Sequence, residues 1–380
     1  MTESKYIKSD IRSQSLDLLR FPLAILVLTV HVISPNGLIV QGSNVSVSSF
    51  PAIEFMMNFI NAFLRAQSVP IYYFISGYVF FLSANFSSDI YKNKLKNRVH
   101  SLLIPYLVWN ALALLWLLFK SLPIFESLAP GLQSVPCDFS LRALIMSFWD
   151  ASEGVIQLVN PSTHQFYPVN SPLWFIRDLI IVVISTPIIY LLIKKLRVYT
   201  VYLLLILWFV ADTYSWSHVT QIITAFTFFS WGAYMSIFKK DMIAEFGRFT
   251  KASIISYIVL GVVYLVCAYV YPELCSFVKR FNIIAGLFFA YNVATYLLRN
   301  SICKPNKFLS SSSFFIYISH FLIYNEVLKI LYYITNPSTA VGFIILYFSA
   351  VIICVSLLLL SFYFLNRYTP ALLKIIAGRK

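Results

Sequence analysis

Long apolar segments separated by short polar ones make up most of the chain. Ten of them approach or reach the roughly 20 residues that an α-helix needs to cross a bilayer. The lipid interior offers the backbone no hydrogen-bonding partner, so segments of this kind predict helices. The pattern therefore predicts an all-α polytopic membrane protein, with about ten transmembrane helices near residues 16–36, 69–86, 101–121, 172–193, 199–216, 219–238, 253–272, 279–298, 313–334 and 340–365.

Two further stretches depart from this alternation. Residues 50–65 are apolar but carry Glu54 and two asparagines, which favours an interfacial or re-entrant helix over a span. Residues 122–171 form the longest extramembrane stretch, with several prolines and aromatic side chains and a short helix expected near 139–149. Loops of this length usually carry function or are disordered, and the aromatic content here favours an ordered lid.

The overall composition excludes an ordinary soluble domain. Of the 380 residues, 59% are hydrophobic and only 12% are charged, against about 25% charged residues in a typical soluble domain. The net charge of +14 does not indicate nucleic-acid binding, because the charges sit in short clusters between apolar segments. The polar N-terminus lacks a small-residue cleavage site, so no cleaved signal peptide is expected.

The distribution of lysine and arginine predicts the orientation in the membrane. With the N-terminus in the cytoplasm, 21 basic residues fall on inner segments and four fall on outer segments. Every inner loop is basic, as the positive-inside rule requires. Both termini are therefore expected in the cytoplasm, and residues 1–380 are expected to form a single membrane domain with its long outer loop at about 122–171.

The five cysteines predict no metal centre. None belongs to a CxxC motif or to a Cys/His metal spacing. Free thiols are the simpler expectation, and the alternative is a disulfide between Cys137 and Cys275, which both fall on expected outer segments. The sequence also has no phosphate-binding glycine-rich loop and no GxSxG elbow.

The first apolar segment carries two side chains that are costly inside a membrane, Arg20 and His31. On an ideal helix their eleven-residue separation gives an angular offset of about 20° and a distance of about 16 Å along the axis. Both side chains therefore share one face, with Arg20 near the cytoplasmic end and His31 toward the outer end. Asp17, one turn before Arg20, is placed to pair with it or orient it.

This arrangement suits a reaction in which a phosphate-bearing donor extends along the helix. Arginine binds phosphate through two parallel hydrogen bonds and is always charged. Histidine is the side chain best suited to act as a general base near neutral pH. The alternative is that Arg20 reaches back to the membrane interface and that His31 only packs.

Five segments are distinctive when they are taken in order. They read SLDLLRFPLAILVLTVH, VPIYYFISGYVFF, RVHSLLIPYLVWN, SPLWFIRDLIIVVISTPIIYLL and SSSFFIYISHFLI. Together they resemble the acyltransferase-3 family of bacterial membrane O-acyltransferases, over roughly residues 12–335. The first segment matches the family's hallmark of an Arg or Lys, ten residues and then a His, at Arg20 and His31.

The resemblance implies ten or more helices, acetyl-CoA or a related acyl donor, and O-acylation of a surface or secreted carbohydrate. His31 would then be the catalytic base, and Arg20 would help to hold the donor. Many members of the family carry an added extracytoplasmic domain at the C-terminus. The chain ends 15 residues after the last expected helix, so no such domain is expected here.

The family also has an Arg-x-x-Arg pattern at the start of its third helix. This chain has Arg98 at the first position and Ser101 at the second. Lys94, Lys96 and His100 lie close to Arg98 in the sequence, and we expect them to help it bind the donor. The alternative is that this basic cluster only fixes the topology.

Other residues are candidates for binding the acceptor. Trp174, Arg177 and Asp178 open the fourth expected span from its outer side and indicate a polar cavity, or else a structural ion pair. Arg280 is basic on the outer side, where it would contact an anionic glycan or anchor to a lipid headgroup. His320 lies within the ninth expected span and is a candidate for a second site.

The leading hypothesis is a multi-pass O-acetyltransferase of a bacterial inner membrane. Acetyl-CoA would be the donor, a carbohydrate or lipid-linked glycan the acceptor, and His31 the base for direct transfer. The runner-up is a transporter of a glycan or small organic acid that uses Arg20 and His31 as a relay. No repeat of broken helices is visible in the sequence, which weighs against the transporter.

Overall fold

The computed structural model describes residues 2–32, 38–40, 43–45, 50–82, 86–125, 135, 137–157, 166–213 and 217–378. Nearly all of these residues are helical, and β1 (Leu38–Val40) pairs antiparallel with β2 (Ser43–Val45). The chain divides into two compact units, each of which is assembled from separate stretches of sequence. The first unit comprises Met1–Val27, Asn58–Leu95 and Ile181–Ser313, and the second comprises Leu28–Met57, Lys96–Ile180 and Phe314–Lys380.

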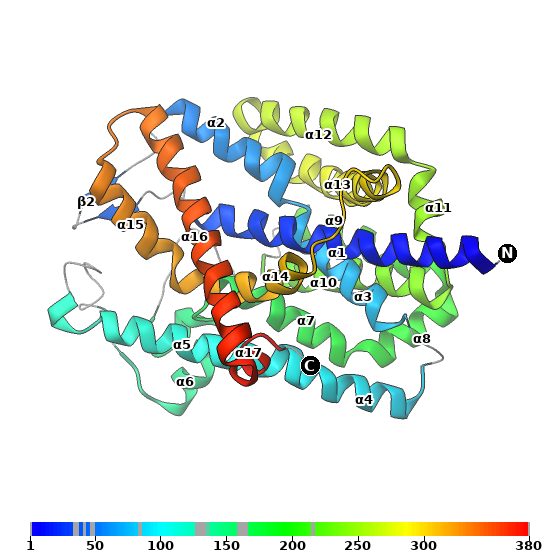
Figure 1. Cartoon of the computed structure of the whole chain (residues 1–380), viewed down its shortest axis with the longest axis horizontal. Helices are drawn as coiled ribbons and strands as arrows, with labels where there is room; N and C mark the ends of the chain where they lie inside the picture. The colour runs from blue at the N-terminus through cyan, green and yellow to red at the C-terminus, as the bar shows by residue number, and fades with distance from the viewer. Residues whose placement is uncertain are drawn as a thin grey trace. The chain divides into compact units, whose positions relative to one another are not determined.

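Helices occupy all ten apolar segments expected from the sequence (Figure 1). Their bounds are α1 (Thr2–Val32), α2 (Pro51–Phe59), α3 (Ser68–Phe80), α4 (Ser88–Arg98), α5 (Ile104–Lys120), α6 (Leu141–Ser147), α7 (Trp174–Ile184), α8 (Thr186–Leu196), α9 (Val198–Thr213), α10 (Ser217–Ile237), α11 (Met242–Gly247), α12 (Thr250–Val270), α13 (Pro272–Arg299), α14 (Lys307–Ser319), α15 (Tyr324–Thr335), α16 (Ala340–Tyr368) and α17 (Pro370–Ile376).

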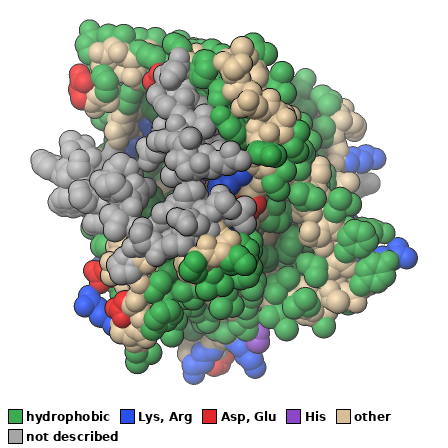
Figure 2. All heavy atoms as spheres, turned by 90° about the vertical axis from the view of Figure 1, so that its left-hand side faces the viewer, with side chains coloured by type: hydrophobic (Ala, Val, Ile, Leu, Met, Phe, Trp, Pro, Cys, Tyr) green, Lys and Arg blue, Asp and Glu red, His purple; other side chains and the backbone are tan. Residues whose placement is uncertain are grey.

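Among the described residues, five helices are long and apolar enough to cross a membrane, or up to seven if each of two bent pairs counts as one span. Large apolar side chains on these helices are exposed, for example Val262 (50%) on α12 and Leu360 (53%) on α16. Figure 2 shows hydrophobic side chains over much of the described surface in that view. An exterior of this kind fits lipid as the solvent. The chain is therefore an all-α membrane protein, while the count of ten spans stays a prediction.

Two segments that the sequence predicts as single spans are bent. α7 and α8 meet at an angle of 63°. Pro187 has no amide hydrogen to continue the helix, and the hydroxyl of Thr186 donates instead to the carbonyl oxygen of Val183 at 2.7 Å. The second bend, of 62°, separates α14 from α15 and follows a 3₁₀ turn at His320–Leu322. His320 therefore lies at a break between two helices and not inside a regular span.

The first unit depends on a close crossing of α3 and α10. A Cβ atom added at Gly77 would clash with the carbonyl oxygen of Phe229, and one added at Gly232 would clash with that of Phe74. Small residues at such crossings let two backbones approach closely, which is a common source of helix association in membranes. These two glycines therefore fix the distance between α3 and α10.

The described part of the long loop expected at about 122–171 is folded within the second unit. It contains α6, whose N-cap Ser140 accepts a hydrogen bond from the amide of Ala143 at 3.2 Å. This helix confirms the short one expected near 139–149. Loop residues join α5 in a small buried core made of Ala113, Leu114, Ala143, Ala151, Val155 and Val169.

The segment at 50–65 is helical, as expected. α2 continues directly into a π-helix at Ile60–Arg65, and Phe55 and Phe59 are exposed on α2. Its interfacial or re-entrant placement stays a prediction.

Candidate active site

The helix α1 carries both residues of the predicted pair, Arg20 and His31, without a break. It passes from the first unit into the second after Val27, so each end is described within its own unit. In the first unit, a guanidinium nitrogen of Arg20 lies 2.8 Å from Asp17 Oδ1, which confirms the expected ion pair. The two side chains are 39% and 38% exposed, so an anionic ligand can still reach the guanidinium.

In the second unit, His31 lies against residues from the far end of the sequence. Its ring centroid is 5.3 Å from that of His320 and 5.9 Å from that of Tyr324. The rings of His320 and Tyr324 are 6.2 Å apart, so the three form one cluster, which we call the histidine cluster. The break between α14 and α15 provides two of its three members.

The hydrogen bonds of His320 define which of its nitrogens carries a proton. Its Nδ1 lies 2.6 Å from the carbonyl oxygen of Tyr317 and 3.2 Å from that of Ile316. A carbonyl oxygen only accepts, so Nδ1 is the donor, and in the neutral ring Nε2 holds a lone pair. The ring is 1% exposed, and Nε2 has no hydrogen-bond partner within the described part of the chain. His320 thus presents a proton acceptor whose orientation is fixed by its own helix.

The last turn of α1 is held in place by α16. The hydroxyl of Tyr347 donates to the carbonyl oxygen of Thr29 at 2.9 Å. Thr29 lies two residues before His31, so this bond fixes the backbone from which the His31 ring projects.

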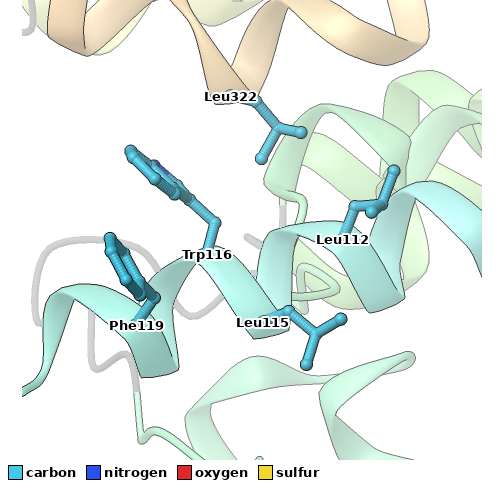
Figure 3. Close-up of a pocket in the computed structure, with 5 residues that line it drawn as sticks. All are labelled: Leu112, Leu115, Trp116, Phe119 and Leu322. Atoms are coloured by element: carbon cyan, nitrogen blue, oxygen red, sulfur yellow. The ribbon is translucent and has the colours of Figure 1, made fainter.

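A partly buried ion pair and an apolar groove lie along α5 in the same unit. Lys120 Nζ is 3.0 Å from Glu326 Oε1 and 5.4 Å from the centre of the Trp116 ring. Glu326 is therefore engaged with Lys120. The groove of about 560 Å³ is lined by Leu112, Leu115, Trp116, Phe119 and Leu322, and Leu322 belongs to the same 3₁₀ turn as His320 (Figure 3).

Arg177 and Asp178 form a second polar cluster, which we call the arginine cluster. Arg177 Nε donates to Asp178 Oδ1 at 2.9 Å, and another guanidinium nitrogen donates to the carbonyl oxygens of Trp149 (2.9 Å) and Phe166 (3.0 Å). The guanidinium also lies 5.0 Å from the centre of the Trp149 ring. Arg177 therefore ties two points of the long loop to α7, and half-buried Trp174 stands one turn before it.

The other predicted site residues are distributed over both units. Arg280, in the first unit, is 5% exposed and donates to the carbonyl oxygen of Phe209 at 2.8 Å, so it is not at a headgroup surface. Lys94, also in the first unit, donates to the carbonyl oxygen of Phe80. Lys96 and Arg98 belong to the second unit, where Lys96 is exposed and Arg98 half-buried. Their roles in binding the donor or the acceptor stay predictions.

The cysteines are all free thiols. Among the described residues, no group of three His, Cys, Asp or Glu side chains is arranged to hold a metal ion.

The sequence marks both histidines as candidates but does not indicate that they lie together. Their rarity was the available signal, since only two of the five histidines fall inside expected spans. The contact between them joins residues 289 positions apart, and no local pattern encodes a separation of that length.

Comparisons with known proteins show what the chain is similar to over most of its length. A family model described as an acyltransferase domain matches residues 13–359. The chain is 24% identical over 340 residues to the succinoglycan biosynthesis protein ExoH of Rhizobium meliloti (strain 1021), covering 88% of this chain and 85% of the relative. No solved structure matches the chain.

Proposed function

This chain belongs to the acyltransferase domain family, and on that premise we propose that it is a membrane O-acetyltransferase. It moves an acetyl group from cytoplasmic acetyl-CoA to a hydroxyl of a surface or lipid-linked carbohydrate. The single observation that carries the proposal is the histidine cluster, in which the rings of His31 and His320 lie 5.3 Å apart and Nε2 of His320 has no hydrogen-bond partner among the described residues. The carbohydrate acceptor rests on the similar protein, which is named for succinoglycan biosynthesis.

The reaction needs a base for the acceptor hydroxyl. His31 accepts that proton while the acceptor oxygen bonds to the thioester carbonyl carbon, and the carbon–sulfur bond then breaks. The proton passes to the departing thiolate, which leaves as the free thiol. His320, whose ring centroid lies 5.3 Å from that of His31, would share or orient this proton.

Direct transfer is favoured over a covalent acyl-enzyme. The nearest hydroxyl in sequence to His320 is that of Ser319, and it donates to the carbonyl oxygen of Phe315 at 2.6 Å. This hydroxyl is committed to its own helix, so it is a poor nucleophile for the thioester.

The donor's phosphates would meet the basic residues of the inner side. Arg20 keeps more than a third of its side chain exposed beside Asp17, and we assign it to donor binding together with Arg98, Lys94 and Lys96. This assignment goes with ten spans, both termini in the cytoplasm and a place in a bacterial inner membrane.

The test is transfer of labelled acetyl from acetyl-CoA to glycan by the purified full-length chain in lipid nanodiscs. We expect transfer by the native chain and by Tyr333→Phe, an exposed control on α15, but not by His31→Ala. Native-level transfer by His31→Ala would contradict the proposed role of His31 as the base.

Absence of acetyl-CoA binding would favour a transporter, which has no need of the donor. Mass spectrometry of surface glycans from a deletion strain would then identify the acceptor.

A further inference from the structure

A second pocket of the second unit lies where α4 leads into α5 and the C-terminal helix α17 approaches them. Its volume is about 360 Å³. Asn97, His100, Ser101 and Ile104 line one side, and Lys374, Ile375 and Gly378 line the other. Figure 1 shows α17 beside α5, at the end of α16. The pocket therefore has one wall from the middle of the chain and one from its end.

The wall formed by α17 is fixed in position. The indole nitrogen of Trp109 on α5 donates to the carbonyl oxygen of Ile376 at 2.8 Å, and Leu373 is only 1% exposed. Gly378 adopts a left-handed φ of +58°, and a Cβ atom there would clash with the backbone of Ser101. Gly378 is thus packed tightly on Ser101, the residue that stands at the second arginine position of the Arg-x-x-Arg pattern.

The lining of the pocket combines apolar surface, including Ile104 and Ile375, with several polar side chains, and it carries no acidic side chain. Every ionisable group on its walls is basic, namely His100 and Lys374, and the amide of Asn97 and the hydroxyl of Ser101 add hydrogen-bonding capacity. Lys374 is exposed and has no ion-pair partner among the described residues. A concave site with this lining attracts an anion, and its volume falls within the range of small-molecule sites.

We propose that this pocket binds the nucleotide phosphates of the acyl donor, with Lys374 of α17 supplying the positive charge that Ser101 lacks. The inference rests on the proposed function, because it takes the donor to be a coenzyme A thioester. Lys374 acts here as a binding residue, and His100 and Asn97 complete the set of donors. The C-terminal helix thereby becomes part of the donor site.

The test uses adenosine 3′,5′-bisphosphate, which carries phosphates of the coenzyme A nucleotide without the thioester arm. Calorimetry on the full chain in phosphatidylcholine nanodiscs compares the native protein with Lys374→Gln. We expect the Kd to rise about fivefold to tenfold, since a charge-assisted hydrogen bond at a partly exposed site is lost. Lys374→Arg should recover most of the affinity. Lys251→Gln, which removes an exposed lysine on α12, should change nothing.

Three outcomes would overturn the inference. One is no binding of the bisphosphate to the native chain, and another is an unchanged Kd in Lys374→Gln. The third is a Lys374 dependence seen only for phosphatidylglycerol in mixed nanodiscs, which would make the pocket a lipid-headgroup site.

Failure of the proposed function gives a different result. The chain would then transfer no acetyl group, while Lys374-dependent binding of the bisphosphate would persist. If both proposals hold, Lys374→Gln raises the KM for acetyl-CoA about fivefold to tenfold and leaves kcat at saturating donor unchanged.

Discussion

The histidine cluster and the arginine cluster of the second unit each contain buried polar side chains, yet these are bonded in different ways. The guanidinium of Arg177 reaches Asp178 and the carbonyl oxygens of Trp149 and Phe166, which come from separate stretches of the loop. His320 bonds only to carbonyl oxygens of its own helix and leaves Nε2 unpartnered within the described residues. The arginine cluster therefore links chain segments together, whereas the histidine cluster contains a nitrogen, Nε2 of His320, that no described residue binds.

This difference suggests a structural role for the arginine cluster and a role in the reaction for the histidine cluster. Burying a polar atom without a partner costs free energy, so such an atom calls for a functional explanation. Asp178 Oδ2 is a partial exception, because it too lacks a partner in the described part of the chain. Its carboxylate is nevertheless paired through Oδ1 with Arg177 at 2.9 Å. We therefore expect substitutions in the arginine cluster to lower stability and substitutions in the histidine cluster to lower activity.

The largest effect is expected for His31→Gln. Removing a general base costs about 10²–10⁴ in rate, and for the residue that takes the proton directly we expect the upper part of that range. The readout is single-turnover transfer of labelled acetyl. The melting temperature should stay near that of the native chain, since the ring is only partly buried. A fall in melting temperature large enough to explain the lost activity would contradict a purely catalytic role for His31.

Arg177→Met should lower the free energy of unfolding by about 3–5 kcal/mol, because it leaves the buried carboxylate of Asp178 without its partner. Thermal unfolding in detergent measures the change. Arg142→Met is the control, since Arg142 pairs with Glu153 at 2.6 Å on the exposed surface and such pairs contribute little. Equal stability of the two variants would contradict a linking role for Arg177.

His320→Asn tests the free nitrogen of His320. The asparagine amide can still donate to the carbonyl oxygen of Tyr317, but no atom replaces Nε2. We expect kcat to fall about 10²-fold with little change in stability. Unchanged kcat would show that the unpartnered nitrogen takes no part in the reaction.

Arg20→Gln should have the smallest effect of the four. Its guanidinium is paired with Asp17 and more than a third exposed, so the lost interaction with the donor is screened by solvent. We expect the KM for acetyl-CoA to rise about tenfold with kcat nearly constant. A fall in kcat at saturating donor would instead place Arg20 at the reacting centre.

The sequence predicts the helices well because the length of an apolar segment and the requirements of a bilayer are local properties. It does not predict the bend after His320, because no proline marks it and the 3₁₀ turn at His320–Leu322 depends on tertiary packing. The carbonyl partners of Arg177 also cannot be predicted from the sequence, because every residue has a carbonyl oxygen and no sequence pattern marks the ones that bind. The sequence marks Lys374 only as one of many basic residues, and its place in a pocket depends on how α17 packs on α5.

The most direct test of the central claim is a double-mutant cycle on the two histidines. Single-turnover acetyl transfer would be measured for the native chain, His31→Gln, His320→Asn and the double variant. If the two rings act as one unit, the double variant is about as slow as His31→Gln alone, because groups that act together lose rate non-additively. A double variant whose loss equals the product of the two single losses would contradict the account.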